Sequence, residues 1–168
     1  AGLRLAEACG LRVADVDFMR GVITPAAQFP AESLKTEISR TPVPVPRSLA
    51  NELARGVSAA SETVLAGADG GQLSTWALER AIRAARVKVD DLPPGFRYHD
   101  LRHYFASLLI ASGADVKTVQ ARLRHASAKT TLDSYGHMWP DRDESTRAAV
   151  DAVLADHADF LRTAASPR

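Results

Sequence analysis

The chain has 168 residues, of which 46% are hydrophobic and 24% are charged, and its formal net charge is +1. This balance excludes a wholly disordered or fibrous chain and fits one domain with a sizeable core. A net charge this small neither requires nor excludes a nucleic-acid partner. The distribution of charge along the chain is therefore the evidence for or against such a partner. Cys9 is the one cysteine, which excludes an internal disulfide framework and fits a reducing, cytoplasmic location. No apolar run approaches the roughly 20 residues of a membrane-spanning helix.

The first predicted elements are a short helix and a small sheet. The helix covers residues 3–9, and it begins without an initiating methionine or a capping residue, so we expect the chain to be a fragment of a longer protein. Short β-type runs at 22–24 and 43–45 predict a small antiparallel sheet of two or three strands. Prolines at positions 42, 44 and 46 lack backbone donors, which places the last strand at an edge.

The rest of the chain is predicted to be helical. A helix over 47–57 is followed by a glycine-rich loop at 66–71, and Ser74 can cap a helix that runs to about Lys88. The hydrophobic spacing predicts further helices at 98–112, 116–123, 128–136 and 143–163. The fold class is therefore α+β and mostly α, with a small antiparallel β-sheet near the N-terminus.

The helix at 98–112 carries two stripes of different character. Its apolar residues follow the helical period and predict the face that packs on the core: Tyr98, Leu101, Phe105, Leu108 and Leu109. The other stripe holds His99, Arg102 and His103, and the three-residue step from His99 to Arg102 puts both side chains on one side. By itself, such a pair also fits an ordinary solvated surface.

Basic residues and histidines gather in the same part of the chain. Four of the five histidines lie between residues 99 and 137. From Arg97 to Lys129 there are six basic residues and two acidic ones. This local surplus predicts a positive patch that the net charge conceals.

Five short motifs follow one another in the chain. They are Gly2-Leu3-Arg4-x-x-Glu7, Leu34-Lys35-Thr36, His99-x-x-Arg102-His103, Leu123-x-His125 and Thr130-Thr131-x-x-x-Tyr135-x-His137. In this order the sequence resembles the tyrosine recombinases of the phage-integrase type over residues 2–139. The family usually has Gly where Arg124 stands. The resemblance makes residues 1–168 a catalytic-domain fragment without its N-terminal helices and core-binding domain, and 141–168 a C-terminal helix or tail.

The resemblance implies DNA cleavage and rejoining through a covalent phosphotyrosine. Tyr135 would attack the scissile phosphorus, giving a 3′-phosphotyrosyl link and a free 5′-hydroxyl. Charged, fork-shaped guanidinium groups suit a phosphate whose charge grows in the transition state. In the implied site, Arg4 and Arg102 would clamp the phosphate and His125 would be a third donor to it. Lys35 would be the general acid for the 5′-oxygen, and His99 would accept the tyrosine proton. Glu7 would support Arg4.

The implied partners are double-stranded DNA and other recombinase protomers in a synaptic tetramer, with no membrane and no cofactor. The helix from Ser74 adds a row of arginines at three-residue steps that can face phosphates. The candidate DNA-binding residues are Arg80, Arg83, Arg86, Arg124 and Lys129. The alternative for this row is a solvated face.

The last predicted helix has an apolar stripe that must be buried somewhere: Val150, Val153, Leu154 and Leu161. In related recombinases the segment after the tyrosine docks on a neighbouring protomer, while the alternative is packing on its own domain. We expect the isolated chain to be mainly monomeric.

Three alternatives remain open from the sequence. His99 and His103 have the i,i+4 spacing of a helical zinc pair, but Asp100 replaces the glutamate of zinc peptidases, so we predict no metal site. A catalytically silent DNA-binding remnant is the second alternative, and the complete set of implied catalytic residues argues against it. A type IB topoisomerase is the third, and the motif around Tyr135 favours a recombinase.

Overall fold

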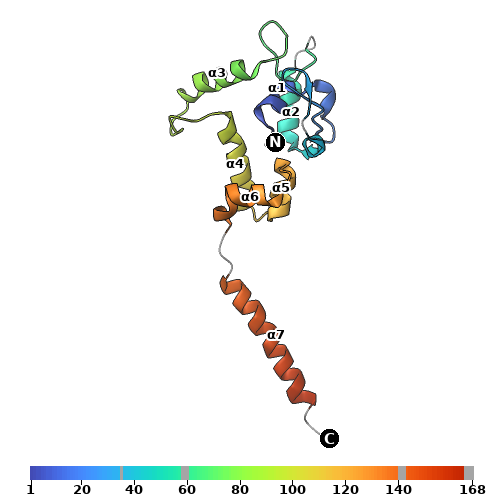
Figure 1. Cartoon of the computed structure of the whole chain (residues 1–168), viewed down its shortest axis with the longest axis vertical. Coiled ribbons are helices and arrows are strands. Elements are labelled where there is room, and N and C mark those ends of the chain that lie inside the picture. The colour runs from blue at the N-terminus through green and yellow to red at the C-terminus, as the bar shows by residue number, and fades with distance from the viewer. Residues whose placement is uncertain (35, 58–60, 140–142, 165–168) are drawn as a thin grey trace. The chain divides into compact units, whose positions relative to one another are not determined.

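The computed structural model describes residues 1–34, 36–57, 61–139 and 143–164 (Figure 1). The chain divides into two compact units, Ala1–Gly136 and His137–Arg168, which are described separately. Among the described helices, none is long and apolar enough to cross a membrane.

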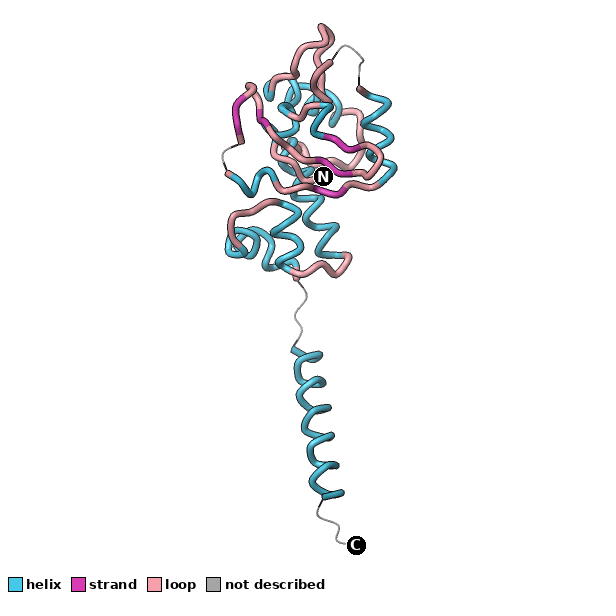
Figure 2. Tube along the Cα trace, turned by 90° about the vertical axis from the view of Figure 1, so that its right-hand side faces the viewer, coloured by secondary structure: helices cyan, strands magenta, loops and turns pink. Residues whose placement is uncertain are grey.

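The N-terminal part of the first unit combines one short helix with short strands, as Figure 2 shows. Helix α1 covers Leu5–Gly10. The three-stranded antiparallel sheet has the order β1-β2-β5, with bounds Val16–Asp17, Val22–Ile23 and Val43–Pro44. The position of β5 at the edge confirms the expectation from the prolines, because a strand without those donors can pair on one side.

A second hairpin was not predicted. Strands β3 (Ala27–Gln28) and β4 (Glu32–Ser33) pair antiparallel, and Ala31 takes a positive φ of 74° in the turn between them. Two 3-10 turns, η1 (Val13–Asp15) and η2 (Glu37–Arg40), complete this region. These strands carry no run of β-branched residues, so their sequence gives little strand signal.

The core of this unit joins the start of the chain to the sheet and to helix α2 (Arg47–Gly56). Leu49 and Leu53, one turn apart on α2, pack against it. The buried core residues are Leu3, Ala8, Leu11, Val16, Ile23, Val45, Ala50 and Val64. This packing fixes the position of the first residues of the chain. Arg4, a candidate catalytic residue, is one of them.

Four helices follow, and side-chain caps fix where three of them begin, the second helix being the exception. They are α3 (Thr75–Arg86), α4 (Tyr98–Ala111), α5 (Val116–Leu123) and α6 (Ala128–Tyr135). Ser74 accepts a hydrogen bond from the Ala77 N–H at 3.1 Å, Asp115 from Thr118 at 2.8 Å, and Ser127 from Thr130 at 3.3 Å. Capping residues satisfy N–H groups that the first turn leaves without partners, so they mark these helix starts in the sequence.

The predicted core face of α4 is confirmed for Tyr98, which packs against the core cluster, and is wrong for Leu101 and Leu108. Its buried residues are Arg102, Ala106 and Ile110, while Leu101 is 45% and Leu108 is 50% exposed. Of the polar stripe, Arg102 is buried because it finds backbone carbonyl acceptors there, which offset the cost of burying its charge, while His99 is exposed. The hydrophobic period located the helix but not its buried side.

The second unit contains η3 (Gly136–Met138, which starts at the unit boundary) and helix α7 (Asp143–Ala164). In α7 the side chains of Val150, Val153 and Leu154 are exposed. The side chain of Leu161, the fourth residue of the predicted stripe, lies outside the described residues. Where this stripe docks stays a prediction.

Candidate active site

The candidate site collects residues from four separate segments of the first unit. Arg4 precedes α1, Arg102 lies on α4, His125 follows α5, and Tyr135 ends α6. Lys35 lies outside the described residues, so its expected role stays a prediction. The end of α5 is the meeting point, because its last backbone carbonyls accept hydrogen bonds from two of the arginines.

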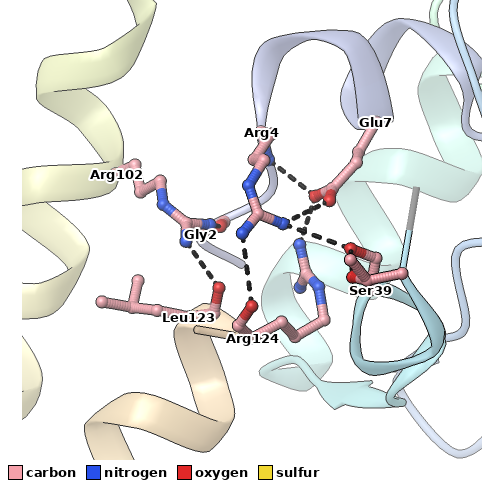
Figure 3. A network of polar contacts seen from close by, with 8 residues as sticks. Gly2, Arg4, Glu7, Ser39, Arg102, Leu123 and Arg124 are labelled. Atoms are coloured by element: carbon pink, nitrogen blue, oxygen red, sulfur yellow. Dashed lines mark hydrogen bonds and ion pairs between the residues drawn. The ribbon is translucent and has the colours of Figure 1, made fainter. Parts of the chain in front are cut away.

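Arg102 is almost fully buried and ties two distant segments together. Its two terminal nitrogens donate to the carbonyl oxygens of Gly2 and Leu123 (Figure 3). Burial, together with the neighbouring charges of Arg4 and Arg124, lowers the pKa of Arg102 to about 10. The guanidinium therefore remains charged at neutral pH, in a place where its charge is poorly screened.

Arg4 is oriented by contacts on several sides. Its Nη1 donates to Glu7 Oε1 at 2.8 Å and to Ser39 Oγ at 3.4 Å, and its Nη2 donates to the carbonyl oxygen of Arg124 at 3.2 Å. The Arg4 N–H also donates to Glu7 Oε2 at 2.8 Å. The side chain is still 43% exposed, so an oriented guanidinium is open to an incoming anion. The contact with Glu7 agrees with the supporting position expected for that residue.

Arg124 departs from its expected place on a DNA-facing surface. Its side chain is completely buried and forms an ion pair with Glu7 (Figure 3). Its backbone is left-handed, with φ 53°, the conformation for which glycine is favoured and which ends α5. The buried Nε and Nη1 have no hydrogen-bond partner among the described residues. Arg124 thus belongs to the interior of the site, because Glu7 neutralises its charge there.

Glu7 is the carboxylate around which these arginines gather. Burial alone would raise its pKa, but the charge of Arg124 and the hydrogen bonds and charge of Arg4 hold the pKa of Glu7 below its ordinary value. Arg102 also interacts electrostatically with this cluster. Two guanidinium groups pair with this one carboxylate and the third lies near enough to interact with its charge, so the site carries a net positive charge and favours an anionic ligand.

His125 is buried next to this positive cluster. Its Nδ1 is 2.9 Å from Thr131 Oγ1, and its carbonyl oxygen accepts a hydrogen bond from Gln120 Nε2 at 3.2 Å. Burial, together with the charges of Arg102, Arg4 and Arg124, lowers the pKa of His125 to about 4. The ring is therefore neutral at neutral pH and can donate from one nitrogen only.

This shift predicts a stability effect in mild acid. A histidine whose folded pKa is about 4 instead of 6.5 binds its proton less readily in the folded state, so the unfolding free energy should fall as pH decreases from 6.5 toward 4. His125→Asn should lose this part of the dependence, and His137→Asn, at an exposed position, should keep it. Urea unfolding at pH 7, 6 and 5 measures both. Parallel pH curves for wild type and His125→Asn would contradict the assignment.

Tyr135 is 4% exposed and lies against two imidazole rings. Its Oη is 2.9 Å from His103 Nδ1, and its ring is stacked with that of His125 at a centroid distance of 6.4 Å. Burial raises the pKa of the Tyr135 phenol, partly opposed by the charge of Arg102. The hydroxyl is therefore protonated at neutral pH and hydrogen-bonded within the positive site.

Comparison with known proteins identifies the family. The sequence model described as the phage integrase family matches residues 1–142. The chain belongs to this family. It is 36% identical over 132 residues to the tyrosine recombinase XerC of Agrobacterium fabrum, covering 77% of this chain and 40% of that protein. It is 43% identical over 67 residues to the ICEBs1 integrase of Bacillus subtilis, covering 40% of this chain and 18% of that protein.

Solved structures show the same fold. The Tn1549 transposon integrase in complex with circular intermediate DNA matches with a TM-score of 0.70 at 21% identity, covering 90% of this chain and 56% of that one. The XerA recombinase matches with a TM-score of 0.66 at 22% identity, covering 90% and 53%. The small sheet followed by helices is thus the fold of these integrase and recombinase chains, and this chain spans about half of their length.

His103 is a residue of the site to which the resemblance gives no catalytic role. His99, which the resemblance assigns to the tyrosine proton, is exposed, and its ring lies edge-on to that of His103 at 4.6 Å. Burial, His103 and Arg102 together lower the pKa of His99. The i,i+4 spacing of His99 and His103 is the sequence signal for this pair, and it is a signal that a helical zinc pair shares.

In the described ranges, no group of three or more His, Cys, Asp or Glu side chains could hold a metal ion.

Besides Arg124, three of the candidate DNA-binding residues have contacts within the chain. Arg80 lies over the ring of Trp76 at 4.5 Å, and Arg86 donates to the Phe96 carbonyl oxygen at 3.1 Å. Lys129 is exposed and pairs with Asp133 at 2.7 Å.

Proposed function

We propose that this chain cuts and rejoins double-stranded DNA at specific sites through a 3′-phosphotyrosyl intermediate. One observation carries the proposal: the protonated phenol of Tyr135 stacks on the neutral ring of His125, and His125 lies beside the arginines that surround Glu7. A nucleophile beside a positive, largely buried site is what phosphoryl transfer requires. The family membership and the described likeness to integrases support the same reaction.

Each residue has a definite task in the proposed reaction. Arg4 and Arg102 would hold the non-bridging oxygens of the scissile phosphate, where negative charge grows. His125, kept neutral, would add one N–H donor. Tyr135 Oη would form a bond to phosphorus as the bond to the 5′-oxygen breaks, and Lys35 would protonate that oxygen. Attack by another 5′-hydroxyl reverses the step, so the bond energy is retained in the phosphotyrosine and no nucleotide cofactor is needed.

The proposal extends to assembly. Exchange of strands between two duplexes needs more than one active site, and the resemblance implies a synaptic tetramer. The exposed side chains of Val150, Val153 and Leu154 on α7 are candidates for contact with a neighbouring protomer. Packing of α7 on its own domain is the competing arrangement.

Covalent capture tests the proposed reaction without knowledge of the DNA sequence. The substrate is a pool of duplexes of randomised sequence, each with one nick. When the chain cleaves close to the nick, the short product diffuses away, which traps the adduct. We expect an adduct that survives denaturing detergent, with the nucleotide attached to the peptide that contains Tyr135. A wild-type chain that binds the pool but forms no adduct would favour the silent DNA-binding remnant.

The arginine row on α3 predicts a change in salt dependence. Replacing Arg80, Arg83 and Arg86 by Gln should weaken DNA binding and lower the slope of log affinity against log salt by up to about 0.9 per phosphate contact removed. The matched control is Arg20→Gln with Arg55→Gln, since both side chains are exposed and lie elsewhere in the chain. Fluorescence anisotropy at several salt concentrations measures the slope. An unchanged slope would identify the row as an ordinary solvated face.

A further inference from the structure

The hydroxyl of Tyr135 is in contact with a histidine to which the resemblance gives no role. Its Oη is 2.9 Å from His103 Nδ1, with the two rings inclined at 62°. Among the hydrogen bonds of the described residues, this is the one that engages the Tyr135 hydroxyl. If Tyr135 is the nucleophile, His103 therefore touches the reacting atom.

The two other histidines of the site are less well placed to take the proton. His125 stacks on the Tyr135 ring, its Nδ1 is engaged with Thr131, and the arginines beside it oppose its protonation. His99 meets the His103 ring edge-on at a centroid distance of 4.6 Å, and none of the hydrogen bonds or ring contacts found among the described residues joins His99 to Tyr135. His99 and His103 are one turn apart on α4, and of the two it is His103 whose ring nitrogen contacts the Tyr135 hydroxyl.

We propose that His103 is a further catalytic residue, the base that accepts the hydroxyl proton of Tyr135 as the tyrosine attacks the DNA. This inference rests on the proposed function. The O–H bond of Tyr135 breaks and an N–H bond forms on His103 Nδ1. The Oη–phosphorus bond forms as the bond between phosphorus and the 5′-oxygen breaks, and that oxygen takes its proton from the general acid. In the rejoining step His103 returns the proton to the departing phenol.

The chemistry of the pair suits this transfer. An imidazole can take and return a proton near neutral pH, and a base must lie about 2.6–3.2 Å from the proton's donor atom. The acceptor role of Nδ1 requires the proton of the neutral ring to be on Nε2, a tautomer assigned from the hydrogen bond. Because burial disfavours a free phenolate, a base in direct contact gives the tyrosine a way to lose its proton only as the new bond forms.

His103→Asn separates proton transfer from positioning. The Asn amide oxygen and His Nδ1 are both bonded to Cγ, so Asn can still accept a hydrogen bond from Tyr135. An amide cannot take the tyrosine proton at neutral pH. In the 168-residue chain we expect the rate of adduct formation on the nicked pool to fall by roughly 10²–10⁴-fold. His99→Asn should cost less, and His137→Asn, at an exposed position after α6, is the matched control.

A sulfur-substituted substrate distinguishes a base from an acid. When the 5′-bridging oxygen of the scissile bond is replaced by sulfur, the leaving thiolate needs no proton. The defect of His103→Asn should persist with this substrate. Recovery of the rate would mean that His103 serves the leaving group, and a rate for His103→Asn within about threefold of wild type on the ordinary pool would mean that it only positions Tyr135. Either result would overturn the proposal.

A measurement without DNA tests the contact itself. In ¹⁵N-labelled chain, we expect the His103 Nδ1 resonance to be that of an unprotonated acceptor at neutral pH and to shift in Tyr135→Phe. A protonated Nδ1, or a resonance that ignores the loss of the hydroxyl, would overturn the role of His103. If instead the contact is found but wild-type chain forms no adduct, it is the proposed function that fails.

Discussion

Replacing Tyr135 with Phe should abolish covalent attachment of the chain to DNA while leaving DNA binding nearly unchanged. The substitution removes the one atom that would bond to phosphorus, and it keeps the buried ring and its stacking on His125. Loss of the hydrogen bond to His103 should lower the unfolding free energy by only about 1 kcal/mol. Covalent capture on the nicked pool and anisotropy with intact duplex measure the two properties separately.

Tyr104→Phe is the matched control for this experiment. Tyr104 lies on α4, and its side chain is 62% exposed, so it should form no adduct of its own and its loss should change nothing. An adduct in the Tyr135→Phe chain, or one mapped to a peptide without Tyr135, would remove this tyrosine from the proposed reaction. Loss of binding together with loss of the adduct would show that the hydroxyl serves the structure instead.

Much of the helical part of the first unit, from α3 to α6, could be predicted because signals in the local sequence mark its helices. Ser74, Asp115 and Ser127 each cap a helix through their side chains, and the bounds of α5 agree with those expected. The β3–β4 hairpin was missed because its residues carry little strand propensity. Caps and turns are properties of a few neighbouring residues, so a sequence displays them directly.

The burial of charged residues could not be predicted in the same way. Hydrophobic spacing placed Leu101 and Leu108 of α4 inside and Arg102 outside, and the structure reverses this. The reversal depends on carbonyl acceptors at Gly2 and Leu123, about a hundred and about twenty positions away in the chain. Arg124 is a similar case, because its ion pair with Glu7 joins opposite ends of the first unit. Such long-range partners leave no periodic signal.

The arginine cluster suggests why Glu7 matters beyond its contact with Arg4. A buried guanidinium is tolerated when a carboxylate faces it, and Glu7 is the carboxylate that Arg124 contacts. Arg124 also has two buried nitrogens without a described partner, so it has little else to compensate its charge. The pair connects α1 with the end of α5, which places Arg4 relative to His125. Glu7 is therefore the residue on which the assembly of the site should depend most.

Glu7→Gln should accordingly lower the unfolding free energy by about 3–5 kcal/mol, because it leaves the charge of Arg124 buried without an opposite charge. Adding Arg124→Gly should recover much of this loss, since it removes the charge and relaxes the left-handed backbone at φ 53°. Glu52→Gln, which breaks the exposed pair with Arg55, is the control and should have little effect. Urea unfolding of wild type, Glu7→Gln, Arg124→Gly and the double variant measures the coupling between Glu7 and Arg124, with Glu52→Gln measured beside them.

The pH dependence gives the same prediction an independent check. The pKa of Glu7 is lower in the folded state than its ordinary value of 4.5, so its carboxylate stabilises the fold fully above that value and loses this contribution as the pH falls through the folded pKa. The stability difference between wild type and Glu7→Gln should therefore be largest near neutral pH and shrink in acid. A difference that is below about 1 kcal/mol at pH 7, or that is constant down to pH 3, would show that Arg124 does not need the Glu7 charge and that the site is held together by other contacts.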